Sequence, residues 1–407
     1  MRPRTRCFAL AVCVVAGALG ADWPQFLGPR RDSTSAETGL AQTWDAKGPR
    51  VVWQKDVGEG FSAPVVAGDR LILFHRVGDD EIVECLDAAT GKEKWKHSDP
   101  TKYADPLGKG DGPRATPVIA GERVYTLGPS GRLLCRKLSD GEKVWQRELL
   151  KDYKVPPSFF GVGTSPIVEA GRVIVNVGAR GSGIVAFDKD TGKEVWKATD
   201  DGASYSSPVA ATLDGVRHVL FFTRQGIVSL DPATGDVHFR KFWRSRMNAS
   251  VNAAAPVVAG EQVFFTSCYD TGAILVRAKK DGLEEIWSND RSLSCHFGTP
   301  VHHDGCLYGF HGRQEAGTEM RCIALKTGQV LWSQEGFGCG SMILAEGNLI
   351  VLSEGGELVL VEAKRDKYRE KARAAVLTGP CRAHMALANG RLYARDNKKL
   401  VCWNLKK

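Results

Sequence analysis

Apolar and polar residues alternate along most of the chain in short runs bounded by Gly, Pro, Asn and Asp. Runs with a period of two predict half-buried β-strands joined by tight turns. The clearest example is Ala186–Trp196 (AFDKDTGKEVW), in which an apolar run, a turn containing Thr-Gly and a second run ending in Trp follow one another. This segment predicts a β-hairpin, because glycine adopts the positive φ that such a turn needs.

The same hairpin pattern recurs along the chain. Cys85–Trp95, Cys135–Trp145 and Cys322–Trp332 are clear copies, and Ser229–Phe239 and Arg277–Trp287 are weaker ones. An aromatic residue ends each copy at the same register, and the separate strand Val51–Lys55 carries Trp53 in that position. The fixed register predicts that these rings are buried between neighbouring copies. The predicted docking residues are Trp53, Trp95, Trp145, Trp196, Trp287 and Trp332.

Two more apolar runs precede each hairpin, and the first of them usually opens with a proline. The openings lie about 46 residues apart, at Pro64, Pro117, Pro166, Pro208, Pro256, Pro300, Met342 and Met385. Eight copies of four short antiparallel strands, with no helical segment, predict an all-β, eight-bladed β-propeller. The eighth copy has only three strands, so we expect the Val51–Lys55 strand to complete it and close the ring.

The N-terminus has the features of a secretory signal peptide. The basic residues MRPRTR precede an apolar run from Cys7 to Leu19, and small residues at Ala18 and Gly20 suit a cleavage site after Gly20. A retained membrane anchor is the alternative, but the apolar run is shorter than the roughly 20 residues of a spanning helix. The expected organisation is a signal peptide over residues 1–20, an irregular arm over 21–50 and a propeller over 51–407. The mature protein is therefore expected in the periplasm or outside the cell.

Charge and cysteine content narrow the classes of function. Loss of three arginines with the signal peptide lowers the formal net charge from +8 to +5, a mild excess that does not indicate nucleic acid binding. Nine cysteines remain. Three of them, Cys85, Cys135 and Cys322, occupy one position of the repeat, which other copies fill with Ala or Ser. That position predicts a small buried residue rather than a disulfide framework. The cysteines left as candidates for one bridge are Cys295, Cys306, Cys339 and Cys381.

The first strand of each blade lines the central channel of a propeller, so the residues just before these strands surround the channel mouth. The third residue before each opening, together with its neighbours, supplies arginines, aromatic rings and imidazoles. We expect Arg114 and Arg382 to be exposed at the mouth and to flank the Phe61 ring. This arrangement suits an acidic or planar ligand or a peptide. A hydrated rim without a ligand is the alternative. The predicted mouth residues are Phe61, Arg114, Tyr205, Asn252, His296, Phe297, Arg382 and His384.

Basic residues concentrate in the long segments between blades. The loops expected over 96–115, 146–163 and 240–253 favour acidic partners, with binding that weakens as salt rises. They carry Lys102, Lys109, Arg147, Lys151, Lys154, Arg240, Lys241, Arg244 and Arg246. The basic segment Lys364–Arg373 in the seventh copy is interpreted as a solvated outer hairpin, because aromatic side chains do not alternate with its cations as nucleic acid binding requires.

The A-x-D-x-x-T-G-x-x-x-W repeat with its SPV and TPV openings resembles the PQQ-type (quinoprotein-like) β-propeller family from Val51 to the end of the chain. The segments DWPQFLGPRRD and NGRLYARDNKKLVCWNL are similar to secreted members found in bacteria such as planctomycetes. The family contains pyrroloquinoline quinone (PQQ) dehydrogenases and BamB-like outer-membrane assembly scaffolds without a cofactor. The resemblance therefore implies the fold and leaves the activity open.

Resemblance to the dehydrogenases implies an adjacent pair of cysteines over the quinone, a Ca²⁺ ion held by Glu, Asn and Asp, and a catalytic Asp. The chain has no adjacent cysteines, no CxxC, CxxCH or HExxH motif, and no long insertions. We therefore expect a non-enzymatic binding or scaffold protein without cofactor or metal, associated with the envelope, which holds a protein or an acidic small ligand on its loop face. The alternative is a PQQ-dependent quinoprotein oxidoreductase acting on alcohols or sugars, with PQQ and Ca²⁺. Neither a nucleic acid partner nor a transmembrane segment is expected.

Overall fold

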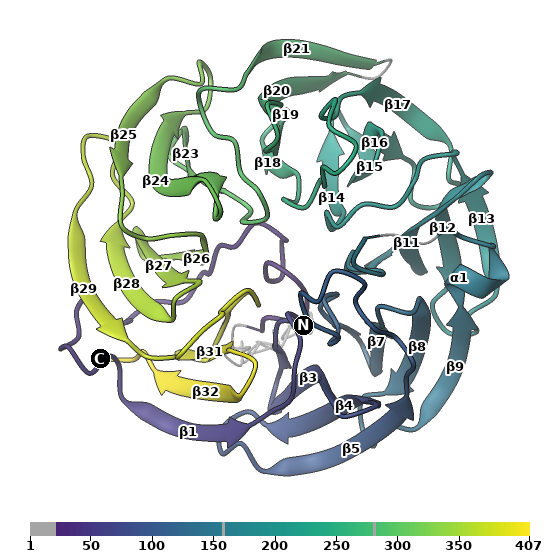
Figure 1. Ribbon diagram of the computed structural model, residues 1–407, viewed down its shortest axis with the longest axis horizontal. Helices are drawn as coiled ribbons and strands as arrows, with labels where there is room; N and C mark the ends of the chain where they lie inside the picture. Colours follow the sequence, from purple (N-terminus) through teal and green to yellow (C-terminus); the bar gives the residue numbers. More distant parts are fainter. Residues whose placement is uncertain (1–21, 157–158, 280–281) are drawn as a thin grey trace, which may run out of the picture.

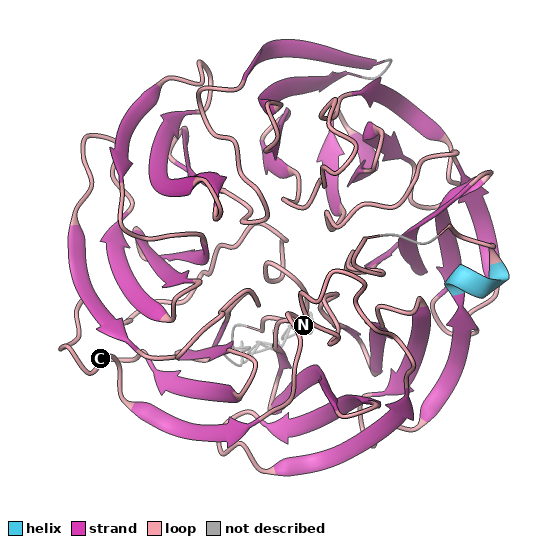
Figure 2. Ribbon diagram, in the orientation of Figure 1, coloured by secondary structure: helices cyan, strands magenta, loops and turns pink. Residues whose placement is uncertain are grey.

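The computed structural model describes residues 22–156, 159–279 and 282–407. The predicted signal peptide lies outside these residues. Eight four-stranded antiparallel sheets are arranged around a central axis (Figure 1). The prediction of an eight-bladed propeller is confirmed, and Figure 2 shows that strands and loops make up almost all of the described chain.

The first four blades follow one another along the chain. Blade 1 contains β2 (Val65–Ala67), β3 (Arg70–Val77), β4 (Asp80–Asp87) and β5 (Glu93–Pro100). Blade 2 contains β6 (Val118–Ala120), β7 (Arg123–Leu127), β8 (Arg132–Lys137) and β9 (Lys143–Glu148). Blade 3 contains β10 (Ile167–Glu169), β11 (Arg172–Ala179), β12 (Ser182–Asp188) and β13 (Glu194–Ala198). Blade 4 contains β14 (Val209–Leu213), β15 (Val216–Phe222), β16 (Gly226–Leu230) and β17 (Val237–Phe242).

The last four blades complete the ring. Blade 5 contains β18 (Val257–Ala259), β19 (Gln262–Ser267), β20 (Gly272–Lys279) and β21 (Gly282–Asn289). Blade 6 contains β22 (Val301–His303), β23 (Cys306–Arg313), β24 (Gly317–Ala324) and β25 (Val330–Gln334). Blade 7 contains β26 (Gly340–Ala345), β27 (Asn348–Ser353), β28 (Glu357–Glu362) and β29 (Glu370–Ala375). Blade 8 contains β30 (Ala386–Ala388), β31 (Arg391–Arg395), β32 (Lys399–Asn404) and the N-terminal strand β1 (Val51–Asp56).

The ring closes through the N-terminal strand, as predicted. β1 pairs antiparallel with β32, with Trp53 opposite Cys402 and Asp56 opposite Lys399. In Figure 1 the purple β1 lies next to the yellow β32. The fourth strand of blade 8 is therefore supplied from the other end of the chain, so the last blade has the same four strands as the others.

Two expectations from the sequence are wrong in detail. A single turn of helix, α1 (Leu149–Asp152), follows β9, where no helix was expected. The three basic loops begin later than predicted, because β5, β9 and β17 continue to Pro100, Glu148 and Phe242.

All nine cysteines of the described chain are free and buried. The four cysteines that were candidates for one bridge, Cys295, Cys306, Cys339 and Cys381, are therefore not paired. Cys306 lies within β23, whereas the other three precede blades 6, 7 and 8, so the fold places them at different points around the ring.

Each predicted docking tryptophan joins its blade to the next one. The indole N–H groups donate to backbone carbonyls in the hairpin of the following blade. The pairs are Trp53 to Ala88 (3.1 Å), Trp95 to Leu138 (3.0 Å), Trp145 to Lys189 (3.0 Å), Trp196 to Pro232 (3.2 Å), Trp287 to Leu325 (2.9 Å) and Trp332 to Lys364 (2.9 Å). The predicted interblade role of the tryptophans is confirmed.

The turn glycine of most hairpins that receive a tryptophan is required for a second reason besides its backbone conformation. Gly192 has a φ of +68°, and a Cβ atom placed on it would lie 2.6 Å from the Trp145 ring of the preceding blade. Gly235 has the same relation to Trp196, also at 2.6 Å. Any side chain at these turns would therefore displace the docked indole as well as strain the turn.

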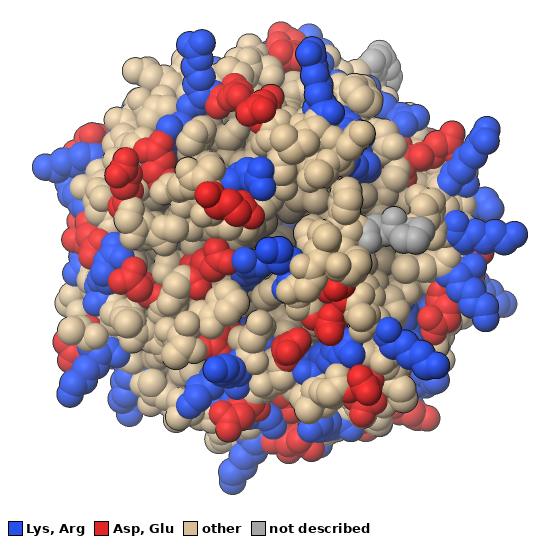
Figure 3. Space-filling view, in the orientation of Figure 1, with Lys and Arg blue, Asp and Glu red and all other residues tan. Residues whose placement is uncertain are grey.

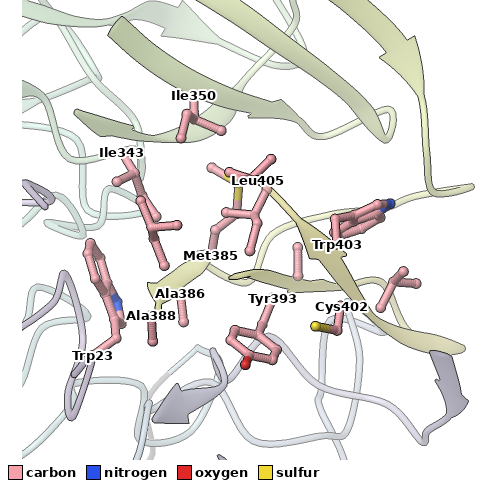
Figure 4. Close-up of a cluster of buried hydrophobic side chains, with 14 of the residues drawn as sticks. Trp23, Ile343, Ile350, Met385, Ala386, Ala388, Tyr393, Cys402, Trp403 and Leu405 are labelled. Atoms are coloured by element: carbon pink, nitrogen blue, oxygen red, sulfur yellow. The ribbon is translucent and has the colours of Figure 1, made fainter. Parts of the chain in front are cut away.

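Two blades lack a docking tryptophan. Blade 4 has Phe239 at this register, and blade 7 has Ala372 opposite Leu360. Ala372 belongs to a core cluster of large side chains from blades 7, 8 and 1 and from the arm. Figure 4 shows part of this cluster, with Trp23 of the arm and side chains of blades 7 and 8. Trp23 of the arm is fully buried in this cluster, and Trp44 packs against it. Trp23 pairs with the inner strand β2, whereas the part of the arm that carries Trp44 reaches blade 7, where the Thr43 hydroxyl donates to the Lys371 carbonyl next to Ala372.

The arm crosses the strands that line the central channel. Trp23 forms two backbone hydrogen bonds with Val66 in β2, and the Ser33–Ser35 segment forms two with Leu344 in β26. The buried Arg31 guanidinium donates to the carbonyls of Pro166 and Pro208, just before β10 and β14. The irregular arm predicted from the sequence therefore acts as a plug, which we define as residues 22–36. In Figure 1 this purple segment crosses the middle of the ring.

Deletion of residues 22–57 should leave blade 8 one strand short and remove the plug. We expect the variant to be insoluble, or to melt far below the full chain, because the exposed edge of β32 and the channel strands lose their backbone partners. Circular dichroism melting measures this. A deletion variant that melts at the temperature of the intact chain would contradict ring closure by β1.

Trp196→Ala and Trp44→Ala separate docking positions from the arm. Trp196 is 9% exposed and hydrogen-bonded to the next blade, so its truncation should cost about 3–5 kcal/mol of unfolding free energy. Trp44 is only partly buried, and its loss should cost clearly less. Denaturant unfolding of both variants gives the two values, and equal losses would show that the repeat register does not determine the stability contribution.

Candidate functional site

A cavity of about 490 Å³ opens at the channel mouth on the face that carries the interblade loops. We call it the central cavity. Its volume falls within the usual range for ligand sites. The wall includes all of the predicted mouth residues except Asn252, namely Phe61, Arg114, Tyr205, His296, Phe297, Arg382 and His384. Figure 3 shows the hollow near the middle of this face.

The plug forms the floor of the central cavity. Phe26 lines the cavity and meets the His384 ring edge-on, with 5.8 Å between ring centroids. The His384 Nδ1–H donates to the carbonyl of Met385 (2.8 Å), and Nε2 accepts from the Ser33 hydroxyl (3.1 Å). Burial lowers the pKa of His384 to about 4. This histidine is therefore neutral at pH 7, and both of its ring nitrogens are already occupied.

Two arginines flank Phe61, as the sequence predicted. The guanidinium carbons of Arg114 and Arg382 each lie 5.4 Å from the centroid of the Phe61 ring. Arg114 also lies 5.5 Å from the centroid of Phe160. A cation over the face of an aromatic ring is attracted by that ring. These contacts therefore hold the two arginines and the two phenylalanines in a defined arrangement.

Arg114 is not the exposed residue that the sequence suggested. Its Nη2 pairs with Asp105 at 2.9 Å, its Nη1 donates to Gly110 O at 3.0 Å, and its side chain is only 12% exposed. These contacts close the loop that follows β5. Removal of this guanidinium would take away a hydrogen bond to a buried carboxylate and cost about 1.5–3 kcal/mol.

Arg382 retains groups that can bind a ligand. Its Nε donates to Glu354 at 2.6 Å, and its side chain is 28% exposed. Among the described residues, nothing accepts a hydrogen bond from its Nη1 or Nη2. The end of this guanidinium therefore remains available to an anion at the cavity mouth.

On the opposite wall, His296 is held between two partners. Its Nδ1–H donates to Gln314 Oε1 (2.6 Å), and its Nε2 accepts from the Tyr269 hydroxyl (2.8 Å). Burial lowers the pKa of His296 from its ordinary value, so the ring is neutral at pH 7. Arg313 covers Tyr269, with its guanidinium carbon 4.5 Å from the ring centroid.

Asn252 lies behind the cavity wall and does not face the cavity. Its Nδ2 donates to Thr223 O (2.8 Å), and its Oδ1 accepts from Ser267 (3.1 Å). Its own carbonyl accepts from the Tyr205 amide at 3.0 Å. These contacts position the segment before β14 that carries Tyr205, so we assign Asn252 a structural role.

Sequence reasoning missed several cavity residues. Phe26 comes from the plug, Tyr269 from the turn between the second and third strands of blade 5, and Arg313 from the end of the second strand of blade 6, where the equivalent turn begins. In an antiparallel blade these turns lie at the same end as the interblade loops. That alternation was available in the sequence pattern and could have identified both turns.

The predicted basic rim is partly neutralised. Arg147 pairs with Asp152, Arg240 with Asp201 and Lys241 with Glu285. In the part of the chain that is described, no carboxylate pairs with the other six, which are Lys102, Lys109, Lys151, Lys154, Arg244 and Arg246. Figure 3 accordingly shows acidic and basic side chains intermixed on this face. The Lys364–Arg373 segment also carries internal ion pairs, Arg369 with Asp366 and Arg373 with Glu370.

The cavity residues do not fit a Ca²⁺-bound quinone. No group of three His, Cys, Asp or Glu side chains within the described ranges could hold a metal ion. The acids at or behind the cavity wall, Asp105, Glu315 and Glu354, each pair with an arginine. The two cavity histidines are neutral and hydrogen-bonded. No helix among the described residues is both long and apolar enough to span a membrane.

Comparison with known sequences supports the repeat assignment. A sequence model described as "Outer membrane protein assembly factor BamB" matches residues 32–156 and 155–334. The BamB of Burkholderia pseudomallei is 27% identical over 225 residues, which cover 53% of this chain and 50% of that protein. The chain thus spans about half the length of this relative. The quinohemoprotein alcohol dehydrogenase ADH IIB of Pseudomonas putida is 28% identical over 127 residues, 28% of this chain and 17% of the enzyme.

Solved structures show the same fold at low sequence identity. BamB from Moraxella catarrhalis superimposes with a TM-score of 0.64 at 17% identity, covering 88% of this chain and 97% of that one. Quinohemoprotein alcohol dehydrogenase from Comamonas testosteroni gives a TM-score of 0.66 at 14% identity, covering 95% and 81%. Together with the repeated docking tryptophans, the sequence match shows that the chain belongs to the PQQ-type repeat family of β-propellers that includes the BamB assembly factors.

Proposed function

We propose that this protein is an exported, non-enzymatic scaffold that binds a partner protein on its loop face. The observation that carries the proposal is a set of exposed apolar side chains on three interblade loops and on the last residue of the outer strand β17. Leu107 is 52% exposed, Phe159 41%, Phe242 76% and Met247 45%. Elsewhere in the described chain, the strongly exposed large apolar residues are valines, mostly on outer strands.

The central cavity lies among these loops and supports the same proposal. Leu107 and Phe159 line its mouth, and aromatic rings and Arg382 line its wall. Aromatic residues, Met and Arg are enriched at the centres of protein interfaces, where one side chain of the partner fills a concave pocket. A partner side chain in the central cavity would have apolar walls around it and a guanidinium at its edge.

The state of the titratable groups favours binding over catalysis. His296 and His384 are neutral and hydrogen-bonded, and the nearby carboxylates pair with arginines. A general base needs a free acceptor within reach of a substrate proton. The assembly-factor names of the relatives support a scaffold role at the cell envelope.

Site-specific photo-crosslinking tests the proposal in cells. A photo-reactive amino acid at Leu107 or Phe242 should give defined protein adducts, whereas the same probe at Val195 or Val330 on the outer strands should not. Arg382→Ala should lower the adduct yield without changing the melting temperature by more than a few degrees, because Arg382 is a partly exposed ion-pair residue. Adducts from the outer strands alone would refute loop-face binding.

A PQQ-dependent oxidoreductase is the second candidate, favoured by the similarity to quinohemoprotein alcohol dehydrogenases and by the aromatic walls of the cavity. Bound PQQ would supply a two-electron acceptor. Protein expressed with PQQ and Ca²⁺ should show no stoichiometric quinone absorbance and no dye reduction with alcohols or sugars, because the described cavity residues include no free carboxylate that could hold Ca²⁺. The appearance of both signals would replace the scaffold proposal with the oxidoreductase.

A further inference from the structure

A second pocket lies beside the central cavity on the loop face. It has a volume of about 340 Å³ and is lined by the loop Trp243–Met247 and by Tyr269, Asp270 and Thr271. We call it the side pocket. Tyr269 lines both the side pocket and the central cavity. A single tyrosine therefore forms a ridge between two concave sites.

The backbone at this ridge is unusual. Tyr269 has a φ of +66° and Asp270 a φ of +58°, so two consecutive residues other than glycine adopt the left-handed conformation. Such conformations cost free energy and are concentrated at functional sites. Ser245 and Thr271 hold the turn, since both hydroxyls donate to the Tyr269 carbonyl, at 2.7 and 3.2 Å.

The side-pocket loop is fixed from below. Arg224 donates from Nη1 to Ser250 O (2.6 Å) and from Nη2 to Asn248 O (2.5 Å), which holds the end of the loop. The Trp243 ring stacks on Phe222, with 5.5 Å between centroids. The pocket is therefore preformed, and a ligand would not have to order it on binding.

Positive charge exceeds negative charge along this path. Arg244 and Arg246 line the side pocket, and neither has a carboxylate partner in the described ranges. Arg313 lies above the ridge, and among the described residues its guanidinium contacts one acid, Glu315, at 3.4 Å from Nε. Asp270 is the one acid in the side-pocket lining. Guanidinium groups on both sides of the ridge favour carboxylates between them.

We propose that one extended acidic segment of a partner protein crosses both sites. An aromatic or large aliphatic side chain enters the central cavity, the following residues cross Tyr269, and acidic side chains reach Arg313, Arg244 and Arg246. This inference rests on the proposed function and specifies the chemistry of the partner segment. A small planar acid fills one site only, and a bilayer surface does not enter a concave cavity, so two sites divided by a ridge suit an extended peptide.

Fluorescence anisotropy with the full mature chain tests the inference. The probes are two labelled synthetic peptides, one with a single Trp followed by four acidic residues and one with the reverse order. At low salt, one order should bind about tenfold or more tightly than its control with Lys in place of the acids, and than its control with Ser in place of Trp. Binding should weaken as salt rises.

Charge reversal at single residues locates the two halves of the peptide. Arg246→Glu should weaken binding of the acidic peptide by about fivefold or more, and Arg382→Glu should do the same from the central cavity. Lys197→Glu, an exposed cation on the outer strand β13, is the matched control and should bind as the unchanged protein does. All three side chains are at least partly exposed, so the melting temperatures should agree within a few degrees.

Three outcomes would overturn the inference. These are failure of both peptides to bind better than their controls, wild-type binding by Arg246→Glu, and binding to phosphatidylglycerol vesicles without binding to either peptide. Loop-face crosslinks to a protein, together with failure of both peptides, would overturn this inference and leave the proposed function intact. Peptide binding without loop-face crosslinks in cells would leave the peptide inference intact and overturn the proposed function.

Discussion

Docking of one indole ring onto the turn glycine of the next blade is the contact on which the ring depends. The indole buries apolar surface, and its N–H satisfies a backbone carbonyl that would otherwise lack a partner between the two sheets. Trp145 shows both halves, since it donates to Lys189 O and occupies the space that a Cβ on Gly192 would need. Five turn glycines, Gly91, Gly141, Gly192, Gly235 and Gly328, lie against a docked indole in this way, whereas the blade 7 turn that receives Trp332 has no glycine. The interblade loops on the loop face can then differ in sequence and length, because they do not hold neighbouring blades together.

The repeat could be predicted from the sequence because each of these contacts needs a particular residue type. Tryptophan supplies the ring, glycine the turn and the space, and Asp188 accepts from the Thr191 amide and hydroxyl within the turn. The plug could not be predicted, because its contacts are made with backbone groups that need no particular residue type. Arg31 donates to the carbonyls of Pro166 and Pro208, and Trp23 pairs with the backbone of Val66, so the receiving positions carry no recognisable side chain.

The candidate site was predicted in part for related reasons. The position of Phe61 between Arg114 and Arg382 follows from blade geometry, and the structure has it. The burial of Arg114 depends on Asp105, nine residues earlier in an irregular loop, and no periodicity indicates that pairing. Tyr269 comes from a turn in blade 5, and Arg313 comes from the end of β23 in blade 6. A site assembled from four or more segments becomes visible only when the ring has closed.

The path of the plug also constrains how the chain can fold. Ser33 contacts His384 across 351 residues, and Arg31 contacts Pro208 across 177. Contacts of such long sequence separation form late, because the entropy of closing the intervening loop must be overcome first. The N-terminal segment is made first but reaches its final position only when blades 3, 4, 7 and 8 exist. An unfinished chain cannot complete the central cavity, whose floor includes Phe26, so binding on the loop face would be confined to chains that have finished folding.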